Sequence, residues 1–378
     1  MNLHLTEEHN LIRDMAREFA ETVLKPGVIE RDNEQHFPAE LVNQMAELGF
    51  MGMQVDPNYG GGGMDTISYV IAIEELSRWD ASASVIISVN NSLVCWGLNE
   101  FATHEQKEKY LKPLALGETV GAFCLSEPEA GSDATQQRTT AIDMGDHYLV
   151  NGTKNWITNG GRADTYLVMA HTDREKKHKG INCLIVEKGM EGFEVGPKED
   201  KLGIRGSDTH SLNFNDVKVP KENRVGEDGF GFKFAMKTLN GGRIGIAAQA
   251  LGIAAGAFDL ALAYSKIRKA FGTEIFNHQA IQFKLADMKM ELEASRALVY
   301  RAAWEKDQGM DYAASAAMAK LHASKTAMFC ANEAIQIHGG NGYVKEYHVE
   351  RFLRDAKITE IYEGTSEIQR MTIARDLR

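Results

Sequence analysis

Hydrophobic positions recur every three or four residues through the first part of the chain. The first such segment follows Thr6, a suitable helix N-cap, and its apolar face is expected to consist of Leu11, Ile12, Met15 and Phe19. A second segment begins after Pro38, and Thr103 with Gln106 forms a capping box before another. Residues 1–116 are therefore predicted to form an N-terminal helical domain.

The pattern changes near Gly117 to short apolar runs that are separated by turn residues. Strands are expected at residues 165–171, 181–187 and 211–214. Asn151-Gly152 lies between two further apolar segments, and this dipeptide favours a β-hairpin. Residues 117–225 are predicted to form a compact antiparallel, barrel-like β domain.

From residue 226 the helical period returns and continues to the end of the chain. One seam steps by threes and fours, as in a helical bundle, through Ile281, Leu285, Met288, Leu292, Ser295 and Val299. The apolar stretch 244–264 contains Gln249 and Asp259, so a buried bundle helix is expected there and not a membrane span. The fold class is predicted to be α+β multidomain, with a C-terminal four-helix bundle over residues 226–378.

Composition and charge narrow the functional classes. The chain has 378 residues, 43% of them hydrophobic, and a net charge of -11, which disfavours a nucleic-acid partner. Its four cysteines are far apart and form no Cys-x-x-Cys pair, so we expect reduced thiols and no metal site. Met1 leads directly into an amphipathic helix without a secretory pattern. We therefore expect a cytoplasmic protein.

The most distinctive segment lies near the end, where Glu363 stands between Tyr362 and Gly364. Gly364 permits a sharp turn, and Thr365 or Ser366 can cap the helix that follows. For an isolated Glu-Gly pair, an exposed loop glutamate would be the ordinary interpretation. A carboxylate that serves only solubility does not need such a corner, so Glu363 is a candidate catalytic residue.

Four other segments could bind a ligand. Residues 123–133 predict a strand that ends in a Pro-Gly-Ser turn, and residues 156–158 place a tryptophan in the β domain. Taken singly, these would be read as an ordinary β-turn and a core tryptophan. Residues 268–272 carry an arginine suited to a phosphate, and residues 336–340 end in two glycines whose backbone N–H groups could approach an anion.

Two glycines also lie inside a helical stretch, at residues 240–243. Each costs roughly 1 kcal/mol relative to alanine in a helix, so they indicate either a need for space or a helix boundary.

These segments, in this order and over nearly the whole chain, resemble the signatures of the acyl-CoA dehydrogenases, in particular those of the short-chain, butyryl-CoA type. The resemblance implies that Glu363 removes the α-proton of an acyl-CoA thioester while the β-hydrogen passes to FAD as hydride. The FAD contacts that it implies are Phe123, Leu125, Ser126, Gly131, Ser132, Trp156, Ile157, Thr158, Arg268, Phe271, Gln279, Gln336, Ile337, Gly339, Gly340, Thr365, Ser366 and Glu367. The substrate contacts that it implies are Ser132, Asn240, Arg243, Tyr362 and Gly364.

The chain departs from the family pattern at two positions. Glu129 replaces a common glycine, and Asn240 stands where relatives often carry Asp. Some relatives place the base just before the channel arginine, where this chain has Gly242, so this chain follows the branch with the base at Glu363.

The resemblance also implies partners. The product would be a trans-2-enoyl-CoA, and the electrons would pass to electron-transferring flavoprotein. Arg268 and residues 336–340 would reach the FAD of a neighbouring subunit, which predicts a homotetramer built as a dimer of dimers. An acyl-CoA oxidase on the same scaffold and a non-catalytic FAD- or CoA-binding protein are the alternatives.

Overall fold

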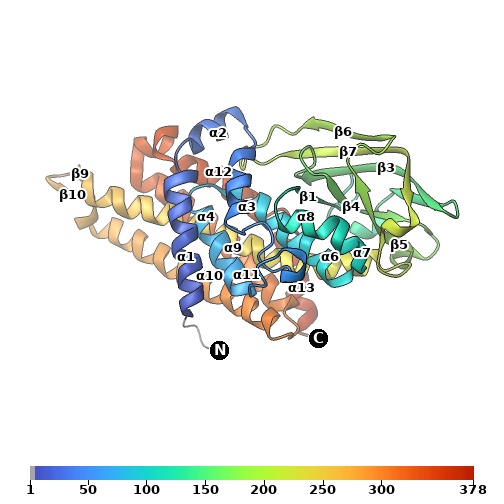
Figure 1. Ribbon diagram of the computed structural model, residues 1–378. Helices are drawn as coiled ribbons and strands as arrows, with labels where there is room; N and C mark the ends of the chain where they lie inside the picture. The colour runs from blue at the N-terminus through green and yellow to red at the C-terminus, as the bar shows by residue number, and fades with distance from the viewer. Residues whose placement is uncertain (1–4) are drawn as a thin grey trace.

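The computed structural model describes residues 5–378 and contains helical, β and helical regions in that chain order. Figure 1 shows the β-sheet at one end of the molecule and a small β9–β10 hairpin at the opposite end. The helices lie between them. The predicted three-part order of the fold is confirmed.

The N-terminal region is helical, as predicted. Its helices are α1 (Glu7–Phe19), α2 (Val28–Glu34), α3 (Ala39–Glu47), α4 (Thr66–Ser77), α5 (Ala81–Ser88), α6 (Trp96–Phe101), α7 (His104–Gln106) and α8 (Lys112–Ala115). Thr6 caps α1, and the Thr103–Gln106 capping box opens α7. Leu11 was placed on the buried face of α1 but is 66% exposed, because the inward stripe runs through Ile12, Ala16 and Phe19. Helix α2 was not predicted.

Three segments form one continuous apolar helix over Ala81–Phe101. A π-helical turn, η3 (Val89–Cys95), joins α5 to α6, and all seven of its residues are buried. Insertions of this kind are frequent at functional sites. Leu93, within this turn, lies beside the candidate active site described below.

The middle region is one eight-stranded sheet. Its strands are β1 (Gly121–Cys124), β2 (Thr140–Asp143), β3 (His147–Thr158), β4 (Thr165–His171), β5 (Ile181–Glu187), β6 (Phe193–Lys198), β7 (Thr209–Pro220) and β8 (Arg224–Val225). The order is β6-β7-β3-β2-β4-β5-β8, with β1 also paired to β4. The sheet is mainly antiparallel, but β1 and β2 pair with β4 in parallel, which the sequence did not predict.

The predicted hairpin at Asn151-Gly152 is wrong. The chain does not reverse there, because β3 pairs along its whole length with β7. The ladder shifts register between Val150 and Gly152, and Gly152 adopts a φ of 146°. A Cβ at Gly152 would lie 2.5 Å from the Thr139 hydroxyl oxygen, so this glycine serves a bulge and a close approach of two segments.

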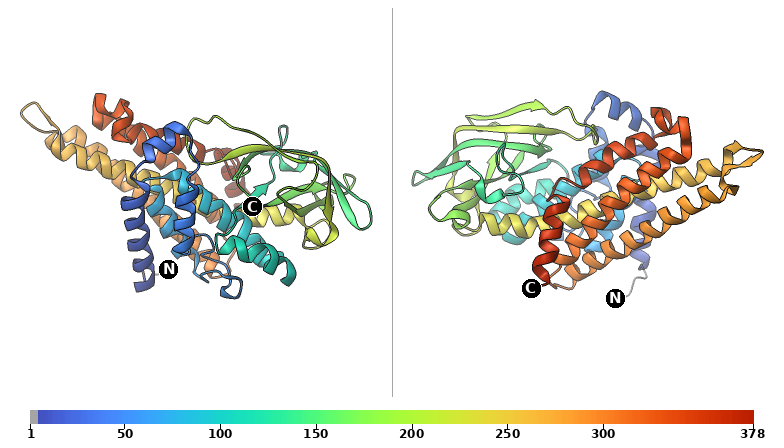
Figure 2. Two further views of the ribbon diagram at one scale, coloured as in Figure 1. Left: turned by 45° about the horizontal axis from the view of Figure 1, so that its top comes forward. Right: turned by 180° about the vertical axis from the view of Figure 1, so that it is seen from behind.

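The C-terminal region consists of long helices. They are α9 (Gly231–Ile267), α10 (Gln279–Asp307), α11 (Ala313–His338), α12 (Val349–Thr359) and α13 (Ser366–Asp376), with β9 (Lys269–Ala270) and β10 (Thr273–Glu274) between the first two. The predicted seam of α10 is buried from Leu285 to Val299, although Ile281 is only half-buried. In the two views of Figure 2 the β9–β10 hairpin protrudes from the ends of α9 and α10.

Two apolar cores hold the molecule together. One joins the N-terminal and C-terminal helices, and the other fills the sheet. Two helices, Ala81–Phe101 and Gly231–Ile267, are long and apolar enough to cross a membrane by length and composition. In each, most of the apolar window is buried inside the protein, 89% and 72% respectively, so both pack as core helices.

Candidate active site

The predicted catalytic corner is a short link between α12 and α13. Glu363 has a φ of 53° and Gly364 a φ of 94°, so two consecutive residues adopt left-handed backbone conformations. Such a conformation is uncommon for a residue other than glycine, and it persists only where the surroundings enforce it. Thr365 then caps α13, as its hydroxyl accepts a hydrogen bond from the N–H of Ile368 at 3.4 Å. The sharp turn therefore directs the Glu363 side chain away from α13 and toward α9.

Two side chains hold this corner through one carbonyl group. The amine of Lys320, on α11, donates to the Gly364 carbonyl oxygen at 2.6 Å, and the Gln369 side-chain amide donates to the same oxygen at 2.7 Å. The Gln369 amide also donates to the Glu363 carbonyl oxygen at 3.3 Å. Neither Lys320 nor Gln369 was among the residues predicted for the site. A lysine within the alanine-rich run of α11 was the available signal for Lys320.

The carboxylate of Glu363 rests on the backbone of α9. A Cβ at Gly242 would lie 2.1 Å from the Glu363 Oε2 atom and 2.7 Å from a methyl carbon of Leu93. Gly242 lies inside α9, so it marks no helix boundary. The paired glycines were expected to mark either a need for space or a helix boundary. At Gly242 it is the need for space, because the Glu363 carboxylate occupies the position that a side chain would take.

Burial controls the charge of this carboxyl group. The Oε2 atom is buried, and it has no hydrogen-bond partner among residues 5–378. Burial raises the pKa of Glu363 to about 7, while the positive charges of Lys320 and Arg243 oppose that rise. Arg243 is itself buried and donates to the Asn240 side-chain oxygen at 2.9 Å. A carboxyl group that titrates near neutral pH is suited to general base catalysis.

Polar side chains line the face of α9 beside the carboxylate. The Tyr362 hydroxyl donates to the side-chain oxygen of Gln249. The hydroxyls of Tyr69 and Ser88 lie 2.9 Å apart, and a Cβ at Gly245 would come within 2.4 Å of the Tyr69 oxygen. Since Gly242 and Gly245 lie one turn apart on the same helix, this hydroxyl pair and the Glu363 carboxylate approach the same face of α9.

The loop that follows β1 is fastened to β3 by a buried lysine. Lys154 is fully buried, and its amine donates to the Leu125 carbonyl oxygen at 3.1 Å and to the Glu127 carboxylate at 2.7 Å. Burial lowers the pKa of Lys154, and the negative charge of Glu127 opposes this effect. In addition, the N–H of Asn155 donates to the Ser126 carbonyl oxygen at 2.8 Å. The predicted flavin-binding segments on β1 and β3 are thus brought together.

Within these segments the predicted contacts differ in exposure. Trp156 has a φ of 61° and its side chain is 61% exposed, so the expectation of an ordinary core tryptophan does not apply. Gly131 and Ser132 are exposed and Thr158 is half-buried. Ile157 packs into the core of the sheet, so only its backbone can face a ligand. Phe123 and Leu125 are also largely buried.

The predicted FAD contacts between Arg268 and Gly340 form a second group at the other end of the molecule, whereas Thr365, Ser366 and Glu367 directly follow the Glu363–Gly364 corner at the start of α13. The aromatic rings of His338 and Tyr264 stack 4.2 Å apart, which places the end of α11 beside the end of α9, next to Arg268. Phe271, Gln279, Gln336, Gly339 and Gly340 are exposed there. Arg268 follows Gly242 by 26 residues of helix, a span of roughly 39 Å. One chain therefore does not bring these residues to its own Glu363.

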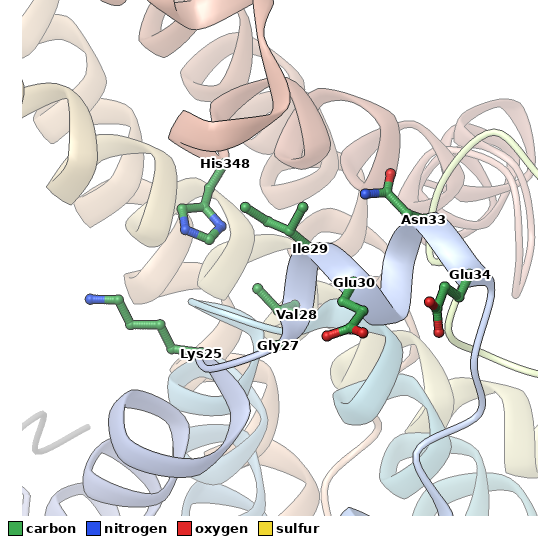
Figure 3. A pocket seen from close by; sticks show the side chains of 8 residues that line it. All are labelled: Lys25, Gly27, Val28, Ile29, Glu30, Asn33, Glu34 and His348. Carbon is green, nitrogen blue, oxygen red and sulfur yellow. The ribbon is translucent and has the colours of Figure 1, made fainter.

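A surface cavity of about 440 Å³ shares no residue with the predicted site. It lies between α2 and His348, and Figure 3 shows Lys25, Glu30 and Glu34 around it. Acidic side chains at its wall do not suit a phosphate ligand. Within residues 5–378, no group of three or more His, Cys, Asp or Glu side chains could hold a metal ion.

Comparisons with known proteins agree along the whole chain. Family models described as the acyl-CoA dehydrogenase N-terminal, middle and C-terminal domains match residues 6–118, 122–217 and 229–378. The short-chain specific acyl-CoA dehydrogenase of Clostridium acetobutylicum is 52% identical over 374 residues, which is 99% of each chain.

Solved structures give the same result. Butyryl-CoA dehydrogenase from Megasphaera elsdenii is 48% identical with a TM-score of 0.98 over the full length of both chains. A chain from a structural study of the electron transferring flavoprotein of Acidaminococcus fermentans is 51% identical with a TM-score of 0.98, over 100% of this chain and 99% of that one. The chain therefore belongs to the acyl-CoA dehydrogenase family.

Proposed function

We propose that this protein is an FAD-dependent dehydrogenase of short-chain acyl-CoA thioesters, with Glu363 as the base that removes the α-proton. The product is the trans-2-enoyl-CoA. The observation that carries the proposal is the Glu363 corner, where a buried carboxylate with a pKa of about 7 rests on Gly242. Family membership supplies the reaction class, and the corner supplies the group that performs proton removal.

The chain's own residues account for the proton transfer. An ordinary glutamate is a weak base toward a carbon acid, and burial strengthens it by raising its pKa. The backbone N–H of Glu363 donates to no group among residues 5–378, so it is free to stabilise negative charge on the thioester oxygen. Tyr362, held by Gln249, forms part of the pocket wall and keeps water from the carboxylate.

The residues around Trp156 fit FAD. Its exposed indole offers a flat face to a planar ring, and Thr158 beside it offers a hydroxyl group. The space in front of Gly131 is open, since no atom lies within 4 Å of where its Cβ would stand. When bound there, FAD accepts the β-hydrogen of the substrate as hydride.

The substrate is a linear acyl chain of about four to six carbons. Each buried methylene contributes only about 0.8 kcal/mol, so kcat/KM should differ by modest factors between neighbouring chain lengths. Relatives named short-chain specific, at about half identity over the whole chain, support the same substrate class.

The active unit is a homotetramer, a dimer of dimers. The second group of FAD contacts, around Arg268, lies too far along α9 from Glu363 to serve the same cofactor within one chain. A neighbouring subunit would therefore complete each site.

The electron acceptor is electron-transferring flavoprotein. The four cysteines are buried and free, which supports a reducing compartment, the cytoplasm. The domain boundaries at 116/117 and 225/226 stay a prediction.

The test is the variant Glu363→Gln, which keeps the shape of the side chain but cannot accept a proton. The purified variant is expected to retain FAD and to bind butyryl-CoA. Anaerobic bleaching of its flavin by butyryl-CoA should be slower by several orders of magnitude, on the scale seen when an essential group is removed. Bleaching at a near-normal rate by a folded variant would refute the proposed base.

A panel of acyl-CoA substrates, assayed with two electron acceptors, tests the proposed chain-length preference and the proposed electron acceptor. The value of kcat/KM should peak at short chains with electron-transferring flavoprotein as acceptor, and turnover with oxygen should be slow. A peak at ten carbons or longer would refute the short-chain assignment. Fast turnover with oxygen would instead indicate an acyl-CoA oxidase. A protein that binds FAD but is not bleached by any acyl-CoA would be a non-catalytic scaffold.

A further inference from the structure

Lys320 is a buried cation in a position where its sequence neighbours are small and apolar. It lies on α11, is 1% exposed, and follows the buried residues Ala316 and Ala319 on the same helix. Removing an ammonium group from water is costly unless specific partners compensate. The direct partner of its amine is the Gly364 carbonyl oxygen, at 2.6 Å. The interaction that holds Lys320 inside the protein is therefore with the catalytic corner.

The Gly364 carbonyl group is part of the Glu363–Gly364 corner, so hydrogen bonds to its oxygen restrain the corner directly. Gly364 is the second of the two residues with left-handed backbone, and it follows the proposed base. Its carbonyl oxygen accepts from Lys320 and from Gln369, so both lone pairs are used. Lys320 comes from α11 and Gln369 from α13, so the two donors tie the corner to two different helices. Loss of either donor frees one side of the corner.

The charges of the Lys320 amine and the Glu363 carboxylate also influence each other. Burial lowers the pKa of Lys320 to about 7, and the negative charge of Glu363 opposes that fall. Other charges act on Lys320 from the surrounding elements: Arg243 on α9, Glu360 at the end of α12 and Glu367 in the first turn of α13. The positive charge of Lys320 therefore favours the ionised form of Glu363, and the carboxylate favours the charged form of Lys320.

We propose that Lys320 is a positioning residue for the reaction: it fixes the Glu363–Gly364 corner through the Gly364 carbonyl group and places a positive charge within electrostatic range of the carboxylate. The inference rests on the proposed function, because it takes Glu363 as the base. Lys320 itself contacts neither the substrate nor the reacting atoms in this assignment. It acts through the geometry and the ionisation of Glu363.

The test compares Lys320→Met with Lys325→Met in the full-length, FAD-loaded enzyme. Lys325 is an exposed lysine on the same helix, so its variant controls for loss of a lysine from α11. In Lys320→Met, kcat with butyryl-CoA should fall by at least about tenfold, because misplacing a catalytic group by about 1 Å can cost as much as 10²-fold. KM should stay within roughly threefold, because ground-state binding is not altered. Lys325→Met should match the unmodified enzyme.

The pH profile separates positioning from a merely structural role. In Lys320→Met the acid limb of kcat/KM should move to higher pH, because the carboxylate loses a cation that opposes its protonation. A buried lysine that only stabilises the fold would lower the melting temperature and leave this limb in place. An unchanged limb together with kcat within threefold would overturn the inference.

Two further variants keep the outcomes distinct. If Lys320→Met does not fold, Lys320→Gln retains a hydrogen-bond donor without the charge, and it should shift the acid limb while keeping most of kcat. An unshifted limb in that variant would overturn the inference. Glu363→Gln, measured in parallel, distinguishes a failure of the proposed base from a failure of the proposed role of Lys320. If it stays active the proposed base is wrong, whereas if it is inactive and Lys320→Met is normal only the role of Lys320 is wrong.

Discussion

Replacing Gly242 by alanine tests whether the proposed catalytic carboxylate of Glu363 depends on the absence of a side chain at a position 121 residues earlier in the sequence. The added Cβ would lie 2.1 Å from the Glu363 Oε2 atom, whereas an ordinary contact needs at least 3.4 Å. The carboxylate must then move by about 1 Å, a displacement that can reduce the rate on the order of 10²-fold. We expect kcat for butyryl-CoA to fall by about that factor.

The same substitution should change stability much less than activity. Alanine is favoured over glycine inside a helix by about 1 kcal/mol, and crowding of a packed site costs about 1–3 kcal/mol. The free energy of unfolding should therefore fall by no more than about 2 kcal/mol, the difference between those ranges. Denaturant unfolding and stopped-flow bleaching of the flavin, measured on one preparation, give both quantities.

The adjacent glycine provides a matched control. A Cβ at Gly241 would lie 3.9 Å from the Lys306 amine, which is ordinary contact. Gly241→Ala should keep most of the activity and gain up to about 1 kcal/mol of stability from helix propensity. The reasoning is refuted if Gly242→Ala turns over butyryl-CoA normally, or if the two variants lose the same activity.

Three further predictions concern pH, the helix cap and the second group of FAD contacts. Since burial raises the pKa of Glu363 to about 7 and only the carboxylate accepts a proton, kcat/KM should rise with pH up to about 7 and then level off; a flat profile from about pH 5 to 9 would contradict this. Thr365→Ala removes the cap of α13, so it should cost about 1 kcal/mol in thermal unfolding and also lower kcat, and an unchanged kcat would show that the cap does not position Glu363. Arg268→Ala removes an exposed cation, so FAD retention on gel filtration should fall while circular dichroism shows that the protein stays folded, and full retention would argue against a shared site.

Much of the fold could be predicted because it depends on local periodicity and local turn chemistry. The strands at residues 165–171 and 181–187 have the predicted bounds, and the seam of α10 is buried as its spacing indicates. The proposed catalytic corner is partly local in origin. Gly364 and the cap at Thr365 favour a sharp turn before a helix.

Other features depended on partners that are distant in sequence. Asn151-Gly152 has the chemistry of a hairpin, but pairing of the whole of β3 with β7 outweighs that local preference and leaves a bulge. Likewise, the parallel pairing of β1 with β4 has no local signature. Backbone pairing across a sheet is decided by which strands meet, and periodicity within one strand carries no information about its neighbour.

The same distinction between local and long-range features applies to the chemistry of the site. The sequence by itself determined that Glu363 stands on a corner and that Gly242 lacks a side chain within a stretch of helical periodicity. Only the tertiary structure placed one on the other, buried the Oε2 atom and brought the Lys320 amine to the Gly364 carbonyl oxygen. The pKa of Glu363 follows from burial and from charges on other helices, and those are properties of packing between segments.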